Sequence, residues 1–181
     1  MQNYLFCVQQ NTMNQITLEI GKNIKMNFNV LLQNVGASQI SYYVIRNLNE
    51  LGNTRPDIDA IVYYETMHRN CLPPNFAIMQ IAEAWGQHGP VIATSLSTAL
   101  KLTGFPSERK IFYVWDLEWL RGEQRHYKMY ADIYTHPDLE LVARSEDHKK
   151  AIENAFNRKV KHVISDFNTD QLLEILEGDN G

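Results

Sequence analysis

The stretch Asn29-Val30-Leu31-Leu32-Gln33-Asn34-Val35-Gly36-Ala37-Ser38 decides the predicted fold. Residues 30–33 form a short apolar run, typical of a buried strand, and Gly36 marks a tight turn. Ser38 is a good helix N-cap. The apolar residues after it step by four, four and three positions, which keeps one face of a helix apolar. These residues are Ile40, Val44, Leu48 and Leu51. The stretch therefore predicts a strand, a glycine turn and a helix.

The same alternation of strand and helix continues along the chain. Further strands are predicted at residues 58–64, 91–93, 111–115, 139–143 and 162–164. Helices are predicted to open at Pro73, Thr94-Ser95, Gln124, Ser145 and Asn168 or Thr169. The helix opening at Pro73 would carry Ile78, Ile81 and Trp85 on one side. Strands separated by helices imply right-handed crossovers and a parallel sheet.

The first 25 residues follow a different pattern. They are rich in Asn and Gln and hold two short β-like runs, at residues 4–8 and 16–20. We expect them to form an N-terminal β-hairpin or extension. No linker interrupts residues 26–181, so we expect these to form one α/β, Rossmann-like domain. Its central sheet would be mostly parallel and flanked by helices.

Composition excludes several classes of protein. With 181 residues, 44% hydrophobic and 21% charged, the chain is an ordinary single globular domain rather than a disordered or fibrous protein. The formal net charge of -4 does not favour nucleic acid or anionic membranes as partners. No apolar run approaches the roughly 18 residues of a membrane span. Two cysteines outside any CxxC pair and an N-terminus unlike a signal peptide predict a cytoplasmic location.

The usual cofactor motifs are missing from the sequence. GxGxxG and GxxxxGK[ST] do not occur, which argues against a standard NAD site and against a P-loop. A GxSxG elbow is also missing, which argues against an α/β-hydrolase. The 6 histidines form no HxH, HExxH or Cys/His cluster. We therefore expect neither a cofactor nor a metal site.

Chemistry is expected where the predicted strands end. In an open parallel α/β sheet, ligands bind beyond the carboxyl ends of the strands. The candidate residues are Gly36, Ser38, Glu65, Thr94, Ser95, Trp115, Asp116, Glu118, Trp119, Arg144 and Ser145. Free amides at the starts of the helices there would suit an anionic or hydroxyl-rich ligand. The alternative is local: the three serines act as N-caps and Gly36 as a turn residue.

The segment Trp115-Asp116-Leu117-Glu118-Trp119 is the most informative of these. Its two carboxylates are two residues apart, so on an extended stretch both can face the same way. Indole rings beside carboxylates suit a sugar, whose CH faces pack on the rings while its hydroxyls bond the acids. A carboxylate near apolar rings can also act as a general base. Alternatively, the tryptophans pack under a helix and the acids bond backbone amides in a turn.

Taken together, residues 28–177 resemble the N-terminal half of a GT-B glycosyltransferase, similar to family 4. Residues 29–51 look like the opening strand and helix of that family, with its glycine turn. Residues 110–119 resemble a fourth-strand segment in which an aromatic strand ends in Asp-x-Glu. Residues 141–145 resemble a late strand leading to a capped helix. Residues 160–173 resemble the strand and loop before the interdomain crossover.

The resemblance implies an acceptor-binding domain that takes part in sugar transfer from a nucleotide-sugar. Its ligand would be a sugar or glycan acceptor, bound in the cleft at the strand ends. GT-B enzymes hold the donor mainly in a second domain, which we expect to lie outside these 181 residues. Transfer is therefore expected only with a donor-binding partner, either another subunit or a homo-oligomer. Asp116 is the expected proton acceptor, and Glu118 is the second candidate.

Two other functions stay open. The chain could be a non-catalytic ligand- or protein-binding module that keeps the Rossmann-like shell, with an intact fold but an obstructed cleft. It could also be a small nucleotide-binding enzyme, although the missing phosphate motifs count against this.

Overall fold

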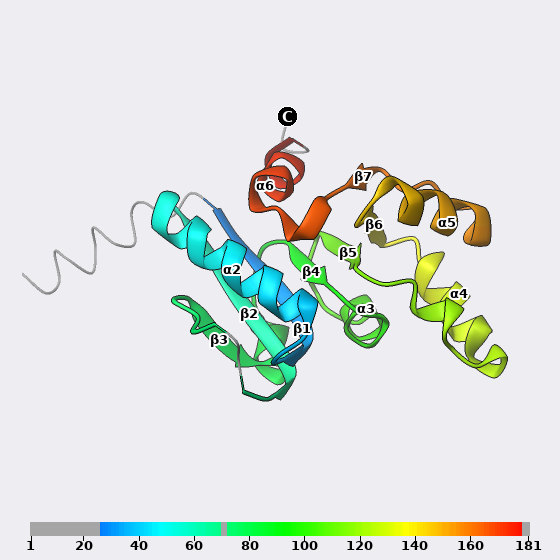
Figure 1. The fold of residues 1–181 in the computed structure, drawn as a ribbon, viewed down its shortest axis with the longest axis horizontal. Coiled ribbons are helices and arrows are strands. Elements are labelled where there is room, and N and C mark those ends of the chain that lie inside the picture. The colour runs from blue at the N-terminus through cyan, green and yellow to red at the C-terminus, as the bar shows by residue number, and fades with distance from the viewer. Residues whose placement is uncertain (1–25, 70–71, 179–181) are drawn as a thin grey trace, which may run out of the picture.

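The computed structural model describes residues 26–69 and 72–178. Seven strands form one sheet in the order β3-β2-β1-β4-β5-β6-β7 (Figure 1). Every neighbouring pair in this sheet is parallel. The predicted α/β, Rossmann-like fold with a parallel sheet is therefore confirmed. The predicted N-terminal hairpin lies outside the described residues.

The strands alternate with helices along the chain. The strands are β1 (Met26–Val35), β2 (Ile58–Met67), β3 (Ala77–Gln80), β4 (Val91–Ala93), β5 (Lys110–Val114), β6 (Leu139–Ala143) and β7 (His162–Val163). The α-helices are α2 (Gln39–Thr54), α3 (Leu96–Thr103), α4 (Tyr127–Tyr134), α5 (Glu146–Phe156) and α6 (Thr169–Gly178). Short 3₁₀ turns are η1 (Ile81–Gly86), η2 (Glu118–Leu120), η3 (Gln124–His126) and η4 (Ser165–Phe167).

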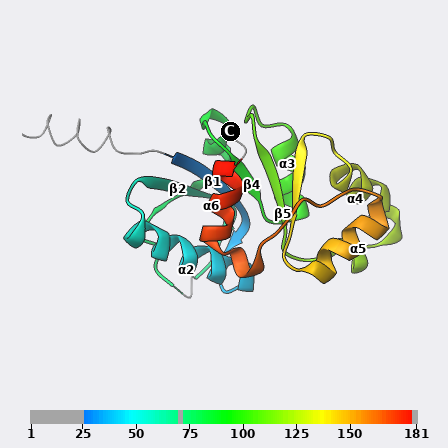
Figure 2. The ribbon, with the colours of Figure 1, turned by 90° about the horizontal axis from the view of Figure 1, so that it is seen from above.

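Helices cover both faces of the sheet. Figure 2 shows α2 and α6 beside each other on one side, and α3, α4 and α5 on the other. Side chains of each strand alternate between the two layers: Val30 and Leu32 pack with α2 and α6, while Leu31 between them packs with α3. All three are fully buried. Burial on both faces explains why the strands read as continuous apolar runs.

The helix starts follow the predicted capping residues. Ser38 Oγ accepts a hydrogen bond from Ser41 N–H at 3.3 Å, and Ser145 Oγ accepts one from His148 N–H at 3.2 Å. Asn168 Oδ1 accepts from Gln171 N–H at 2.9 Å at the start of α6. Each bond satisfies an amide that the helix leaves without a partner in its first turn.

The helix predicted to open at Pro73 is wrong. Residues 77–80 instead form β3, which pairs with β2, and residues 81–86 form the turn η1. The physical reason is that the apolar residues serve both faces of the sheet. Ile78 packs against the layer of α2, and Ile81 packs against the layer of α3. A single helix face cannot reach both layers, whereas an edge strand followed by a turn under the sheet can.

The strand order creates a switch point between β1 and β4. From β1 the chain moves outward to β2 and β3, and it then returns across the sheet to β4. The loop after β1 leads to α2 on one face, and the loop after β4 leads to α3 on the other. In sheets of this kind, ligands usually bind outside the carboxyl ends of the strands, where such loops part.

Candidate functional site

The predicted site residues lie along one edge of the sheet. Because all strands are parallel, their carboxyl ends share that edge, and β1, β4, β5 and β6 are consecutive neighbours. The loops after these four strands carry Gly36, Ser38, Thr94, Ser95, Trp115, Asp116, Glu118, Trp119, Arg144 and Ser145. Glu65 lies near the end of β2. We refer to this row of loops as the carboxyl edge.

Two polar residues predicted for ligand binding, Thr94 and Glu65, make contacts within the fold. The hydroxyl of Thr94 is buried and donates to the carbonyl of Leu31 at 2.8 Å, which ties β4 to β1 at the switch point. Glu65 accepts hydrogen bonds from Ser97 Oγ at 2.8 Å and from Lys101 Nζ at 3.0 Å. The Thr94 bond therefore joins β4 to β1, and the Glu65 contacts join the end of β2 to α3.

The Gly36 turn is tight. A Cβ atom at Gly36 would lie 2.8 Å from Asn34 Oδ1 and 3.2 Å from the Cβ of His68. A larger residue would therefore push aside the Asn34 side chain and press on the loop after β2. Ser38 follows as the cap of α2, whose first turn contains no acidic residue.

Asp116 is the more accessible of the two predicted catalytic acids. Its carboxylate accepts from Leu117 N–H at 2.9 Å and pairs with Arg121 at 2.9 Å. The Asp116 side chain is 36% exposed and that of Arg121 is 77% exposed. A pair as open as this contributes little stability, so Arg121 can leave the carboxylate at small cost.

Glu118 is turned inward, toward the start of α3. Its Oε1 accepts from Leu96 N–H at 3.0 Å, at the first residue of the helix. Burial raises the pKa of Glu118 above its usual range, and the Leu96 hydrogen bond partly opposes this. The negative charge of Asp116 raises the pKa further, and Arg121 lowers it. Glu118 thus occupies the amide end of α3 with a carboxylate of the protein itself.

The two tryptophans are packed within the fold. Trp119 meets the rings of Tyr134 and Phe156 edge-on, with centroids 4.8 and 5.0 Å apart. Trp115 is only 8% exposed and packs against Tyr43 of α2, with ring centroids 5.6 Å apart. Their role as walls for a sugar ring stays a prediction.

Arg144 lies directly over Trp115. Its guanidinium carbon is 4.0 Å from the centroid of the indole ring. The pairing of β5 with β6 explains this contact: Val114 faces Ala143, so the next residues of the two strands stand side by side. Within residues 26–69 and 72–178, the Arg144 guanidinium has no hydrogen bond and no carboxylate within 4.0 Å.

The loop after β7 holds a strained pair of residues that the sequence did not indicate. Asp166 and Phe167 have φ values of 50° and 56°, in the left-handed region that side chains disfavour. Asn47 Nδ2 donates to both of their carbonyls, at 2.8 and 2.9 Å. Tyr113 Oη donates to Ile164 O at 2.9 Å and accepts from Phe167 N–H at 3.1 Å. No glycine marks this turn, so the sequence offered no signal for it.

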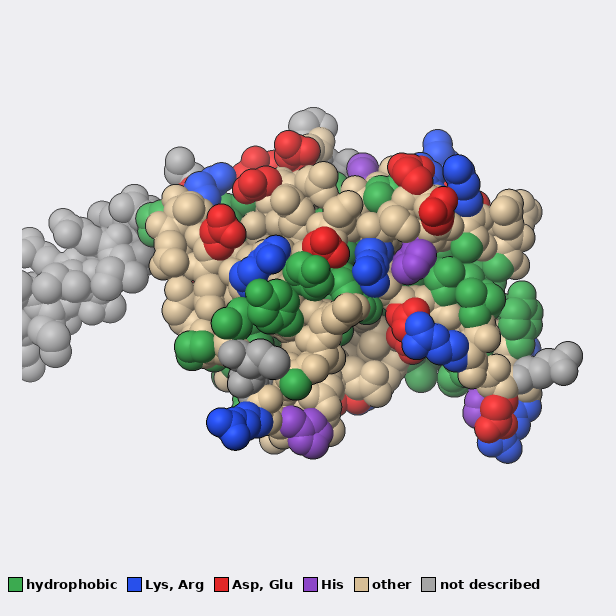
Figure 3. All heavy atoms as spheres, viewed as in Figure 1, with side chains coloured by type: hydrophobic (Ala, Val, Ile, Leu, Met, Phe, Trp, Pro, Cys, Tyr) green, Lys and Arg blue, Asp and Glu red, His purple; other side chains and the backbone are tan. Residues whose placement is uncertain are grey.

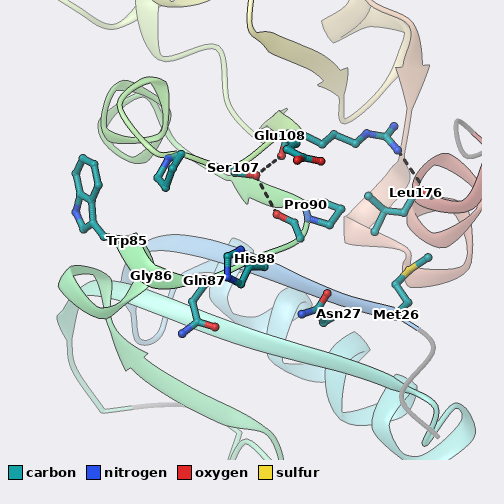
Figure 4. Close-up of a pocket in the computed structure, with 13 residues that line it drawn as sticks. Met26, Asn27, Trp85, Gly86, Gln87, His88, Pro90, Ser107, Glu108 and Leu176 are labelled. Carbon is teal, nitrogen blue, oxygen red and sulfur yellow. Dashed lines mark hydrogen bonds between the residues drawn. The ribbon is translucent and has the colours of Figure 1, made fainter. Parts of the chain in front are cut away.

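Two of the cavities among the described residues were not expected from the sequence, and both lie away from the switch point. One of about 550 Å³ opens at the amino ends of β1, β4 and β5, where Asn27, Trp85, His88 and Glu108 surround it (Figure 4). The other, of about 630 Å³, lies between α2 and the η4–α6 segment and is lined mostly by polar residues. Sequence reasoning missed both, because the strand-end rule addresses only the carboxyl edge.

Charges on the molecular surface are mixed. Figure 3 shows acidic and basic side chains interspersed over the face that carries α2 and α6.

In the described part of the chain, no group of three His, Cys, Asp or Glu side chains could hold a metal ion. No helix within that part is long and apolar enough to cross a membrane.

Comparisons with models of known protein families, with curated proteins and with solved structures find no match to this chain.

Proposed function

We propose that this domain binds a sugar or glycan acceptor at the carboxyl edge and takes part in glycosyl transfer from a nucleotide-sugar. The proposal is supported by the Rossmann-like strand order together with the resemblance of residues 28–177 to the acceptor-binding half of a GT-B glycosyltransferase. A donor-binding partner supplies the second half of the active site. The low cysteine content agrees with a reducing, cytoplasmic setting.

The position of Asp116 carries the proposal. Asp116 directly follows β5, and only β4 separates β5 from β1, so the carboxylate stands beside the switch point. Its side chain is 36% exposed, and its one ionic partner, Arg121, is itself open to solvent. A partly exposed carboxylate at this place can accept the proton of an acceptor hydroxyl as the hydroxyl attacks the donor sugar.

Glu118 has a positioning role in this scheme. Its hydrogen bond to Leu96 N–H fixes the loop after β5 against the start of α3. This holds Asp116 at the crevice rather than offering Glu118 itself to the substrate. The donor partner is needed because holding donor and acceptor in line can supply roughly 7–11 kcal/mol of barrier reduction.

A transfer assay tests the proposal. The chain is incubated with a panel of nucleotide-sugars and acceptors, with and without candidate donor-binding chains. We expect turnover only in a reconstituted pair, where Asp116→Asn should lower the rate about 10²–10⁴-fold, the usual contribution of a general base. Asp138→Asn is the matched control, because Asp138 is exposed and precedes β6 at the opposite edge.

Two results would count against these roles. Robust turnover by the 181-residue chain alone would remove the need for a donor-binding partner. Full activity of Asp116→Asn in a reconstituted pair would remove Asp116 from the role of base and leave it as a turn residue.

One observation favours a second candidate function, a non-catalytic ligand- or protein-binding module. Both acids already have partners in the protein: Glu118 bonds Leu96 N–H, and Asp116 bonds Leu117 N–H and Arg121. A module of this kind would bind ligand at the carboxyl edge, and no donor or partner chain would produce transfer.

A further inference from the structure

The half-buried arginines of the described chain differ in whether their side chains have a partner within the protein. They are Arg55, Arg109, Arg144 and Arg158. Arg55 pairs with Asp57, Arg109 pairs with Glu140, and Arg158 donates to the carbonyls of three residues. Arg144 alone among them has neither an ion pair nor a hydrogen bond within that part of the chain.

From this we infer that Arg144 is the subsite for a phosphate group, so that the acceptor is a phosphorylated sugar or glycan. The identification of the ligand as an acceptor rests on the proposed function. The phosphate subsite itself rests on Arg144 and its surroundings.

The surroundings of Arg144 hold the guanidinium in place before any ligand arrives. The guanidinium carbon lies over the Trp115 ring, 4.0 Å from its centroid, and Tyr43 packs against Trp115 in turn. Stacking uses the face of the guanidinium and leaves its N–H donors, which lie in the plane, free. These donors match two oxygens of a phosphate, and little side-chain entropy is left to lose on binding.

The acidic side chains near Arg144 do not pair with it, so its guanidinium can bind an added anion. Asp116, in the loop after the neighbouring strand β5, pairs with Arg121 instead of Arg144. Glu146 and Asp147, in the first turn of α5, are exposed and form no ion pair with Arg144. The amide end of α3 is not open to a phosphate, because Glu118 already accepts from Leu96 N–H. An anion bound at the ends of β5 and β6 would therefore meet Arg144 without competition from these side chains.

The same geometry sets the type of ligand. Asp116 follows Trp115 in the loop after β5, and Arg144 directly follows the neighbouring strand β6. A single sugar phosphate carries a hydroxyl for Asp116 and a phosphate for Arg144, and the backbones of the two neighbouring strands lie only about 4.8 Å apart. A neutral sugar would satisfy Asp116 but leave the stacked guanidinium without a partner.

Binding measurements by isothermal titration calorimetry test the inference, with the full chain and three probes: a hexose 6-phosphate, the free hexose and UDP. We expect the hexose phosphate to bind more tightly than the free hexose. Arg144→Ala should weaken hexose phosphate binding about 10- to 100-fold, the usual effect of losing charge-assisted hydrogen bonds. Arg144→Lys keeps the charge without the planar fork and should recover only part of the affinity. Lys150→Ala, an exposed cation on α5, is the control and should bind as the wild type does.

The arms of the experiment separate this inference from the proposed function. Equal binding of hexose and hexose phosphate, or unchanged phosphate binding by Arg144→Ala, would overturn the phosphate subsite. Binding of UDP but not of hexose phosphate, lost in Arg144→Ala, would assign the phosphate to the donor and overturn the phosphorylated acceptor. Phosphate binding that depends on Arg144 without transfer in any reconstituted pair would sustain the subsite and count against the transferase. Transfer to neutral acceptors alone would support the transferase and count against the phosphate subsite.

Discussion

The substitution Tyr113→Phe tests how the carboxyl edge is held together. It removes one hydroxyl from a residue that is 1% exposed. That hydroxyl donates to Ile164 O and accepts from Phe167 N–H, at 2.9 and 3.1 Å, across the strained turn after β7. Without it, a buried carbonyl and a buried amide lose their partner. Each such group costs about 1–3 kcal/mol, and removing the hydroxyl also removes the cost of burying it, so we expect a loss of about 2–4 kcal/mol in the free energy of unfolding.

Chemical denaturation of the wild type and the variant measures this difference directly. By thermal melting, the same loss corresponds to a drop in Tm of about 4–16 °C for a chain of this size. Tyr42→Phe is the matched control, because Tyr42 is 39% exposed and its hydroxyl has no hydrogen bond to any residue that the structure describes. A loss below about 0.5 kcal/mol for Tyr113→Phe, similar to the control, would refute the argument.

The pH dependence of stability offers an independent check on Tyr113. Burial raises the pKa of Tyr113 to about 12, although the Phe167 hydrogen bond and Arg144 oppose the shift. The unfolded tyrosine loses its proton near pH 10, so above this pH the unfolded chain binds fewer protons than the folded one. The contribution is complete below pH 10 and is lost as pH rises toward 12. Over this range, Tyr113→Phe should lose stability less steeply than the wild type, by about 1.4 kcal/mol per pH unit.

Two further substitutions test the packing around the crevice and at the opposite edge. Because burial raises the pKa of Glu118, its charged form costs stability at pH 7, and Glu118→Gln keeps an oxygen for Leu96 N–H without that charge. Glu118→Gln should melt at a higher temperature than the wild type at pH 7, and this difference in Tm should shrink at acidic pH, where Glu118 is protonated. A lower Tm than that of the wild type at both neutral and acidic pH would contradict this. Gly89 has φ of 94°, and a Cβ there would lie 2.9 Å from the backbone oxygen of Asn27. Gly89→Ala should therefore lower the free energy of unfolding by about 1–3 kcal/mol, as measured by urea denaturation. An unchanged free energy of unfolding would contradict the argument that a side chain at this position is strained.

The parts of the fold that depend on local sequence could be predicted. Apolar runs located the central strands, and serines located the starts of α2, α3 and α5. These signals are local because a buried parallel strand is apolar along its length and an N-cap acts within its own turn. The prediction for residues 77–80 was wrong because the pairing of β3 with β2, rather than the spacing of its apolar residues, decides the conformation of this segment.

The contacts of the candidate site depend on distant pairings and could not be predicted in detail. The sequence placed Trp115 and Arg144 at strand ends, but only the register of β5 against β6 brings them together. Likewise, the bond from Tyr113 to Ile164 joins residues 51 positions apart. The sequence left open whether Asp116 and Glu118 face the same way or bond backbone amides; in the structure, the turn η2 directs the Glu118 carboxylate to Leu96 N–H at the start of α3.

The central claim, that the carboxyl edge is the ligand site, is tested most directly by mapping where a ligand binds. Amide resonances of the isotopically labelled chain would be followed by NMR during titration with a hexose 6-phosphate. We predict that the shifted amides gather at the loops after β1, β4, β5 and β6, at residues 34–38, 94–98, 114–119 and 143–148. Shifts gathered instead around the cavity at the amino ends of the strands, near Asn27 and His88, would contradict the claim. A saturating concentration of the hexose 6-phosphate that shifts no amide at the carboxyl edge would also contradict it.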